Sequence, residues 1–358
     1  MPVMISCSSD SSPLFPVYIS GKIGYINTQG KLVIDAKFGT GGTITSNFSA
    51  DGLAAASSNN KCGYIDKTGK TVINFIYNTC YDFSEELALV SEVINSMKQE
   101  YKYSYIDKSG NTVIDFEKLG FKLYNPSSFD SQPLNFSEGL TLYQMKDQDK
   151  LDRIDQKVGF IDKSGKIIIP AQFAGATKFS EGLSLIFFKF RTNDDESSTF
   201  GFIDKTGKLV IDLSSTDITL VSLFSEDLAS VMNKNNRKWG FIDTTGKIVI
   251  EPQFDLVGQF SEGLAEVEVN NKWGFIGKSG NIVINPTFER VQKFSEGLAA
   301  VRLNDKWKFI DKNGNTVINL IDEYPEEPFS NGLARIGNKN SEYGYIDKSG
   351  NYVWKPTK

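Results

Sequence analysis

Short runs of β-forming residues alternate with polar turns along almost the whole chain. The runs are rich in Val, Ile, Phe, Tyr and Thr, and they end at Asp, Asn, Gly or Ser, residues that favour turns. No apolar run approaches the roughly 18 residues that a membrane-spanning helix needs. The pattern therefore predicts an all-β protein without a transmembrane segment.

Two phrases recur along the chain and define a tandem repeat. The phrase Phe-Ser-Glu-Gly-Leu-Ala, in close variants, begins at Phe48, Phe83, Phe136, Phe179, Phe224, Phe260, Phe294 and Phe329. The phrase Gly-aromatic-Ile-Asp-x-Ser/Thr-Gly begins at Gly24, Gly63, Ser104, Gly159, Gly201, Gly240, Gly274, Lys308 and Gly344. Such periodicity indicates one repeat array. We divide the chain into a flexible tail, 1–13, and a single tandem-repeat domain, 14–358.

One copy shows what each repeat is expected to form. Two β-rich runs flank Asp243 and Gly246; Asp caps a type I turn, and Gly takes its left-handed position. Phe241 and Ile242 point to opposite faces, so the hairpin is apolar on both sides and must lie between neighbours. The Phe-Ser-Glu-Gly phrase predicts a second turn, followed by a third strand. The predicted unit is a three-stranded antiparallel meander.

The paired phrases resemble the bacterial WG (or KWG) repeat family over about residues 14–354. Three copies keep the Trp of that family, at Trp239, Trp273 and Trp307. Lys308 and Ser104 replace its Gly, and Gly277 replaces its turn Asp. The resemblance implies the repeat architecture but no particular activity, because the family is defined by its repeat.

The repeats suit either a closed ring or an open rod. Nine units exceed the usual four to eight blades of a propeller, which favours an open β-solenoid. The strand-like segment 16–19 and the final hairpin, which reaches Trp354, could instead combine to close a ring. We expect a propeller-like toroid, with the solenoid as the alternative.

Composition excludes several classes of function. The chain has no His, which removes Ser–His and Cys–His catalysis and His-based zinc sites. Its 39 basic and 44 acidic residues give a net charge of −5, without the basic patch that binds nucleic acids. Nucleotide-binding glycine motifs are missing, and we expect no cofactor or metal. The repeated Asp and Glu are interpreted as turn caps and scaffold, and the seventeen phrase aromatics as core.

The three cysteines bear on the compartment. Cys7 follows a small residue and precedes a Ser/Asp tether, an arrangement that resembles a lipoprotein junction; a free thiol in a solvated tail is the alternative. If Cys7 carries a lipid anchor, Cys62 and Cys80 remain as an even pair for a disulfide; two unrelated thiols are the alternative. We expect an extracytoplasmic protein of the cell envelope, with a cytoplasmic location as the alternative.

Insertions distinguish individual repeats and suggest where a partner binds. Extra residues fall at 91–102, 116–135, 143–157 and 189–199. Loop aromatics can anchor a partner, and those proposed here are Phe116, Phe121, Tyr124, Phe129 and Tyr143. The sequence predicts a non-catalytic binding scaffold for a protein or glycan partner. The alternative is a carbohydrate-active hydrolase with carboxylates in a central cavity.

Overall fold

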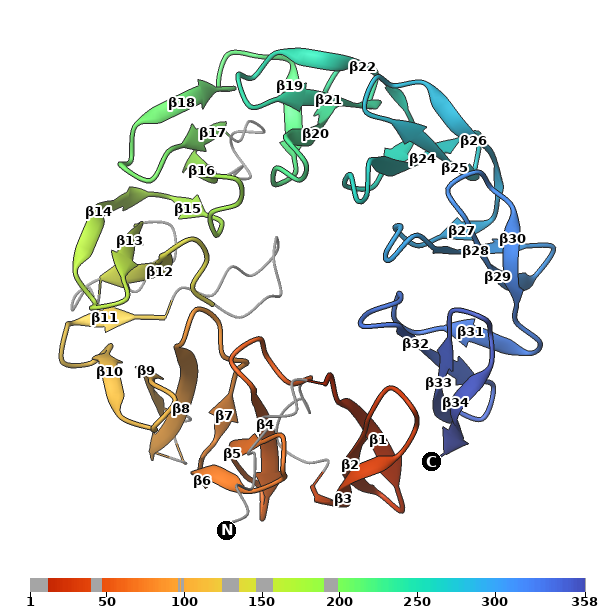
Figure 1. The fold of residues 1–358 in the computed structure, drawn as a ribbon. Coiled ribbons are helices and arrows are strands. Elements are labelled where there is room, and N and C mark those ends of the chain that lie inside the picture. The colour runs from red at the N-terminus through yellow and green to blue at the C-terminus, as the bar shows by residue number, and fades with distance from the viewer. Residues whose placement is uncertain are drawn as a thin grey trace, which may run out of the picture.

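Nine antiparallel sheets surround a common axis in the part of the chain that the structure describes (Figure 1). The structure is a computed structural model, and it describes residues 12–39, 47–95, 97, 100–123, 135–145, 157–189 and 199–357. The protein is a nine-bladed β-propeller, and each sheet is one blade. No helix in these residues is long and apolar enough to cross a lipid bilayer.

The first two blades have three described strands each. Their strands are β1 (Phe15–Ile19), β2 (Lys22–Ile26) and β3 (Leu32–Phe38) in blade 1, and β4 (Leu53–Ser58), β5 (Lys61–Asp66) and β6 (Thr71–Tyr77) in blade 2.

Blades 3 to 5 have four strands each, numbered in chain order. Their strands are β7 (Thr79–Cys80), β8 (Ala88–Asn95), β9 (Glu100–Ile106) and β10 (Thr112–Asp115); β11 (Phe121–Lys122), β12 (Leu140–Met145), β13 (Val158–Asp162) and β14 (Ile167–Phe173); and β15 (Gly175–Ala176), β16 (Ser184–Lys189), β17 (Thr199–Ile203) and β18 (Leu209–Asp212).

Blades 6 to 9 repeat the same four-stranded plan. Their strands are β19 (Ile218–Val221), β20 (Leu228–Asn233), β21 (Trp239–Asp243) and β22 (Ile248–Phe254); β23 (Leu256–Val257), β24 (Leu264–Val269), β25 (Lys272–Gly277) and β26 (Ile282–Phe288); β27 (Arg290–Val291), β28 (Ala299–Leu303), β29 (Lys306–Ile310) and β30 (Thr316–Asn319); and β31 (Glu323–Pro325), β32 (Leu333–Asn338), β33 (Tyr343–Asp347) and β34 (Tyr352–Thr357).

Blades 3 to 9 contain one strand more than the predicted three-stranded unit. In blade 7 the extra strand is β23, which pairs with β24 before the Phe-Ser-Glu-Gly turn. That turn is a two-residue hairpin, because Glu262 (φ 55°) and Gly263 (φ 84°) are both left-handed. The sequence pattern missed this strand because two residues are too short to show an alternation of apolar and polar side chains.

The Asp-x-x-Gly segments form the predicted hairpin turns. Asp243 Oδ1 accepts hydrogen bonds from the backbone nitrogens of Thr245 (2.9 Å) and Lys247 (3.1 Å), and Gly246 has φ 85°. The Thr245 hydroxyl also donates to this carboxylate, and these bonds hold the pKa of Asp243 below its usual value. Where Gly277 replaces Asp, the turn keeps its backbone bonds. The repeated Asp residues therefore cap turns, as predicted.

Aromatic side chains hold neighbouring blades together. The ring after each phrase Gly packs on the phrase Phe of the next blade, for example Phe241 on Phe260 with 4.9 Å between ring centroids. Sixteen of the seventeen predicted core aromatics are buried, and Phe48 is half-buried. The core thus consists of successive layers between blades rather than one central mass.

The contact between blades 9 and 1 reproduces the other blade contacts and closes the ring. Phe15 takes the place of a phrase Phe and packs on Tyr345, whose hydroxyl donates to the carbonyl of Pro16 (3.0 Å). The turn glycine Gly30 also lies against the fourth strand of the preceding blade, although it meets the backbone of Val353 where Gly246 meets the side chain of Ile211. The toroid is therefore the observed fold, and the open solenoid is wrong.

Each four-stranded blade has two ends that differ in what they present. Because consecutive strands are antiparallel, the first-to-second and third-to-fourth turns lie at one end, which we call the turn face. The second-to-third hairpins and the links between blades lie at the other end, which we call the link face. The insertions 91–102, 143–157 and 189–199 each run from the second strand towards or into the third strand of blades 3, 4 and 5 in the sequence.

Candidate functional site

The Glu residues of the Phe-Ser-Glu-Gly phrases bind the neighbouring blade at the turn face. Glu262 Oε2 accepts a hydrogen bond from the Gly297 nitrogen (2.9 Å) and pairs with Lys312 Nζ (3.2 Å). Burial opposes ionisation of Glu262, but these two partners outweigh it and hold its pKa below the usual value. Glu85, Glu138, Glu226 and Glu296 each bind a Gly nitrogen and a Lys in the same way. These carboxylates thus serve as scaffold.

Three of the five predicted partner-binding aromatics are buried, so the expectation that they are exposed is wrong. Phe116, Phe121 and Tyr143 are at most 6% exposed and pack together between blades 3 and 4. Phe121 lies 4.5 Å from Tyr143 between ring centroids, because the start of the insertion turns back into the core. Tyr124 and Phe129 lie outside the described residues.

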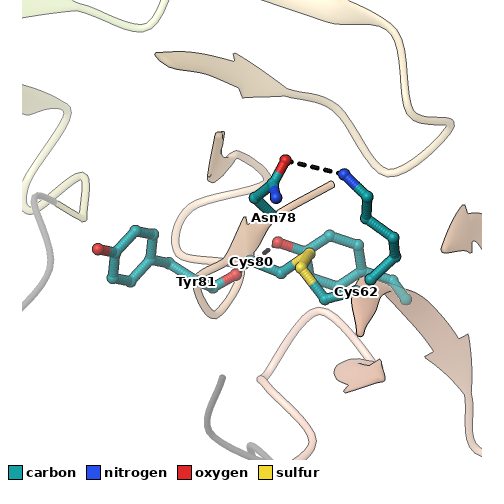
Figure 2. The surroundings of a disulfide bond; sticks show 6 residues. Cys62, Asn78, Cys80 and Tyr81 are labelled. Atoms are coloured by element: carbon teal, nitrogen blue, oxygen red, sulfur yellow. Dashed lines mark hydrogen bonds between the residues drawn. A yellow bond between two sulfur atoms is a disulfide. The ribbon is translucent and has the colours of Figure 1, made fainter. Parts of the chain in front are cut away.

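Cys62 and Cys80 form a disulfide, one of the two states that the sequence left open, and it joins two blades (Figure 2). Cys62 lies on β5 of blade 2 and Cys80 on β7 of blade 3, and their Cα atoms are 6.0 Å apart. Next to it, the hydroxyl of Tyr64 donates to the carbonyl of Tyr81 (2.6 Å). The bond therefore links neighbouring blades covalently. The predicted lipid anchor, Cys7, lies outside the described residues.

A groove on the link face of blades 7 to 9 is the candidate binding site. Its cavity volume is about 650 Å³, within the usual range for ligand sites. We call it the aromatic groove; it is lined by Leu256, Glu268, Trp273, Glu289, Arg290, Val291, Gln292, Trp307, Tyr324 and Pro325. Sequence reasoning missed it because it placed the binding site on the insertions, which lie in other repeats. The signal was present, however, in the Trp that repeats six to eight share.

The two tryptophans are partly exposed because they are larger than residues such as Ile23 and Cys62 at the same position. Ile23 and Cys62 at the equivalent position are 1% and 2% exposed, whereas Trp273 and Trp307 are half-buried. Each indole packs on the core between blades with one part and lines the groove with the rest. Tyr103, Trp239 and Tyr343 are half-buried at the same position as well. Blades 7 and 8 therefore differ from the others in that their half-buried rings line a groove.

The Gly after Trp allows the fourth strand of the blade to lie close to the third strand. A Cβ on Gly274 would meet the carbonyl oxygen of Ile284 and come within 2.6 Å of the Pro286 nitrogen, where β26 bulges towards β25. In blade 8, Lys308 stands at this position, and β30 ends at Asn319 without that bulge. The departure from the repeat pattern is therefore matched by a change in the facing strand.

Some polar side chains of the groove bind other parts of the fold, and others have no partner there. Glu289 accepts hydrogen bonds from the backbone nitrogens of Asn304 (2.9 Å) and Asp305 (3.2 Å), so it holds the β28–β29 hairpin. Gln292 donates to the Pro325 carbonyl (3.2 Å), and its Oε1 has no partner within the described part of the chain. Within that same part, Glu268 and Arg290 form neither an ion pair nor a side-chain hydrogen bond. The two charged side chains without a partner, one negative and one positive, therefore give the groove no net charge from free groups.

No group of three or more metal-ligating side chains occurs among the described residues. A comparison with curated protein sequences finds no match. Among solved structures, the chain is similar to AztD from Citrobacter koseri, with 12% identity and a TM-score of 0.46 over 97% of this chain and 93% of that one. It is also similar to BamB from Moraxella catarrhalis, with 12% identity and a TM-score of 0.42 over 86% and 94%. At these identities and TM-scores, the similarity carries no argument about the function of this chain.

A family model described as "WG containing repeat" matches most of the chain. The seven matched segments are residues 23–62, 63–92, 159–189, 200–237, 239–273, 273–307 and 309–340. They include the copies whose Gly and turn residues have the geometry given above. The chain therefore belongs to the WG repeat family.

Proposed function

We propose that the protein is a non-catalytic binding scaffold and that its partner binds in the aromatic groove. The observation that supports this proposal most is the pair of half-buried indoles, Trp273 and Trp307, in a concave site with an unpaired carboxylate and an unpaired guanidinium. Aromatic side chains beside a few free polar groups are typical of recognition sites.

Binding agrees better than hydrolysis with the placement of the acidic residues. A glycosidase needs two carboxyl groups at a defined separation across the bond to be cleaved. At the turn face the described phrase carboxylates bind the next blade, and in the groove Glu289 holds a hairpin. Glu268 is then left in the groove without a second free carboxylate.

We also propose that the protein works outside the cytoplasm. A disulfide between blades supports this location, because such bonds persist in oxidising compartments. The lipid anchor at Cys7 remains part of the proposal; mass spectrometry of the N-terminal peptide from native membranes would detect it. An unmodified Cys7 thiol in that sample would contradict the anchor.

The groove is tested by footprinting of the tryptophans. An envelope extract is separated into a protein and a polysaccharide fraction, and oxidative labelling of Trp273 and Trp307 is measured with each. Trp239 is the matched control, because it has the same position in the repeat of blade 6 but does not line the groove. We expect one fraction to protect both groove tryptophans and leave Trp239 labelled. If neither fraction protects them, the groove is not the binding site.

A further inference from the structure

The backbone around the aromatic groove restricts the kind of partner it accepts. Trp273 lies on β25, which is paired with β24 on one side and β26 on the other. Trp307 lies on β29, which is likewise paired on both sides. A peptide that binds as an added strand needs a free sheet edge. The free sheet edges beside the groove belong to β23, β27 and β31, which are only two or three residues long. Such short edges disfavour an added peptide strand.

The charges of the groove indicate a neutral ligand. The free charged groups are one carboxylate, Glu268, and one guanidinium, Arg290, since Glu289 is committed to its hairpin. A phosphate-rich ligand would call for several cations, and a cationic ligand for several free carboxylates. A carboxylate accepts hydrogen bonds and a guanidinium donates them, so the pair matches groups that do both. Hydroxyl groups have that property.

The size of the groove indicates a slender ligand. A stable protein interface buries about 800 Å² on each partner and involves about 20–30 residues a side. The aromatic groove has ten lining residues and a volume of about 650 Å³. It therefore suits a narrow chain better than the surface of a folded partner.

We propose that the aromatic groove binds a neutral oligosaccharide of pyranose rings with equatorial hydroxyls. The proposal rests on the function proposed above and names the class of ligand. Equatorial hydroxyls leave the two faces of each ring covered with C–H groups, and these apolar faces stack on the indoles of Trp273 and Trp307. The hydroxyls around the ring edge bind Glu268 and Arg290. Because the two tryptophans come from successive blades, one oligosaccharide spans blades 7 and 8.

Binding of two defined probes, cellohexaose and chitohexaose, tests the proposal. Isothermal titration calorimetry of the whole chain is expected to show binding of at least one of them. Trp273→Ala and Trp307→Ala should each weaken that binding by about tenfold or more. Trp239→Ala should leave it unchanged. Glu268→Gln and Arg290→Ala remove groups without partners in the fold, so they should weaken binding without loss of stability, even where a Trp variant unfolds.

Each outcome supports or overturns the proposal. Lack of binding to both probes at millimolar concentrations overturns it, as does binding that the four groove substitutions leave unchanged. If the probes do not bind but a protein fraction protects Trp273 and Trp307 from labelling, the ligand class is wrong and the binding function stands. If neither the probes nor any fraction occupies the groove, both proposals fail.

Discussion

Alanine substitutions at two turn glycines distinguish the energetic cost of backbone strain from the cost of a disturbed contact between blades. Gly246 and Gly263 have nearly equal left-handed backbones, with φ of 85° and 84°. A Cβ on Gly246 would lie 2.7 Å from Cγ2 of Ile211 in the preceding blade, whereas a Cβ on Gly263 meets nothing within 4 Å. Alanine at either position costs about 1–2 kcal/mol for the left-handed backbone. Only Gly246→Ala adds overpacking, about 1–3 kcal/mol.

The expected losses of unfolding free energy are therefore about 1–2 kcal/mol for Gly263→Ala and about 2–5 kcal/mol for Gly246→Ala. Urea denaturation followed by tryptophan fluorescence measures both, with the disulfide kept oxidised and the m-value checked for constancy. In combination with Ile211→Ala, Gly246→Ala should cost less than it does alone, because the shortened side chain removes the clash. Equal losses for the two glycine variants would show that Gly246 does not report the contact between blades.

Three other properties of the fold can be tested by measurements of stability. Cys62→Ser/Cys80→Ser should lower the unfolding free energy by about 3 kcal/mol, and reductant should then have no further effect; a stability equal to that of the oxidised protein would exclude a disulfide. The pKa of turn carboxylates such as Asp66 and Asp243 is lower in the folded protein than in the unfolded chain. These carboxylates therefore stabilise the fold fully above their pKa in the unfolded chain, and the stabilisation is lost as pH falls below about 4. A thermal midpoint that stays constant down to pH 3 would contradict this. Phe15→Ala should cost about 3–5 kcal/mol, as should Phe329→Ala, and a much smaller loss for Phe15 would mean that the ring is not closed in solution.

Most of the fold could be predicted from the sequence, because every repeat needs the same turn residues and the same core residues. Asp243 and Gly246 reveal their turn through chemistry that acts over a few residues, and Phe241 reveals a core position through its neighbours in the chain. Closure of the ring depends on Phe15 and Tyr345, which are too far apart in the sequence for any local pattern to pair them. The choice between toroid and solenoid was therefore open until the structure placed them together.

The candidate site was less predictable than the fold because it is assembled from several blades. Trp273 and Trp307 are core anchors by their place in the repeat, and the groove that they line is formed together with residues of other blades that no local pattern brings together. The prediction for Phe116 and Phe121 failed for the opposite reason. Both occur in an insertion, which suggested exposure, yet they fill the core between blades 3 and 4. Position in an insertion does not by itself place a side chain at the surface.

The blades meet head to tail through one kind of contact, and this has a consequence for fragments of the chain. Any run of consecutive blades ends in two different surfaces that fit each other, as Phe15 and Tyr345 do where the ring closes. Such surfaces make a heterologous interface, which generates closed rings when the rotation between units allows it. A chain cut to three blades should therefore associate into a trimer that rebuilds the nine-bladed circle. The geometry that closes one chain on itself would then set the number of subunits in an oligomer.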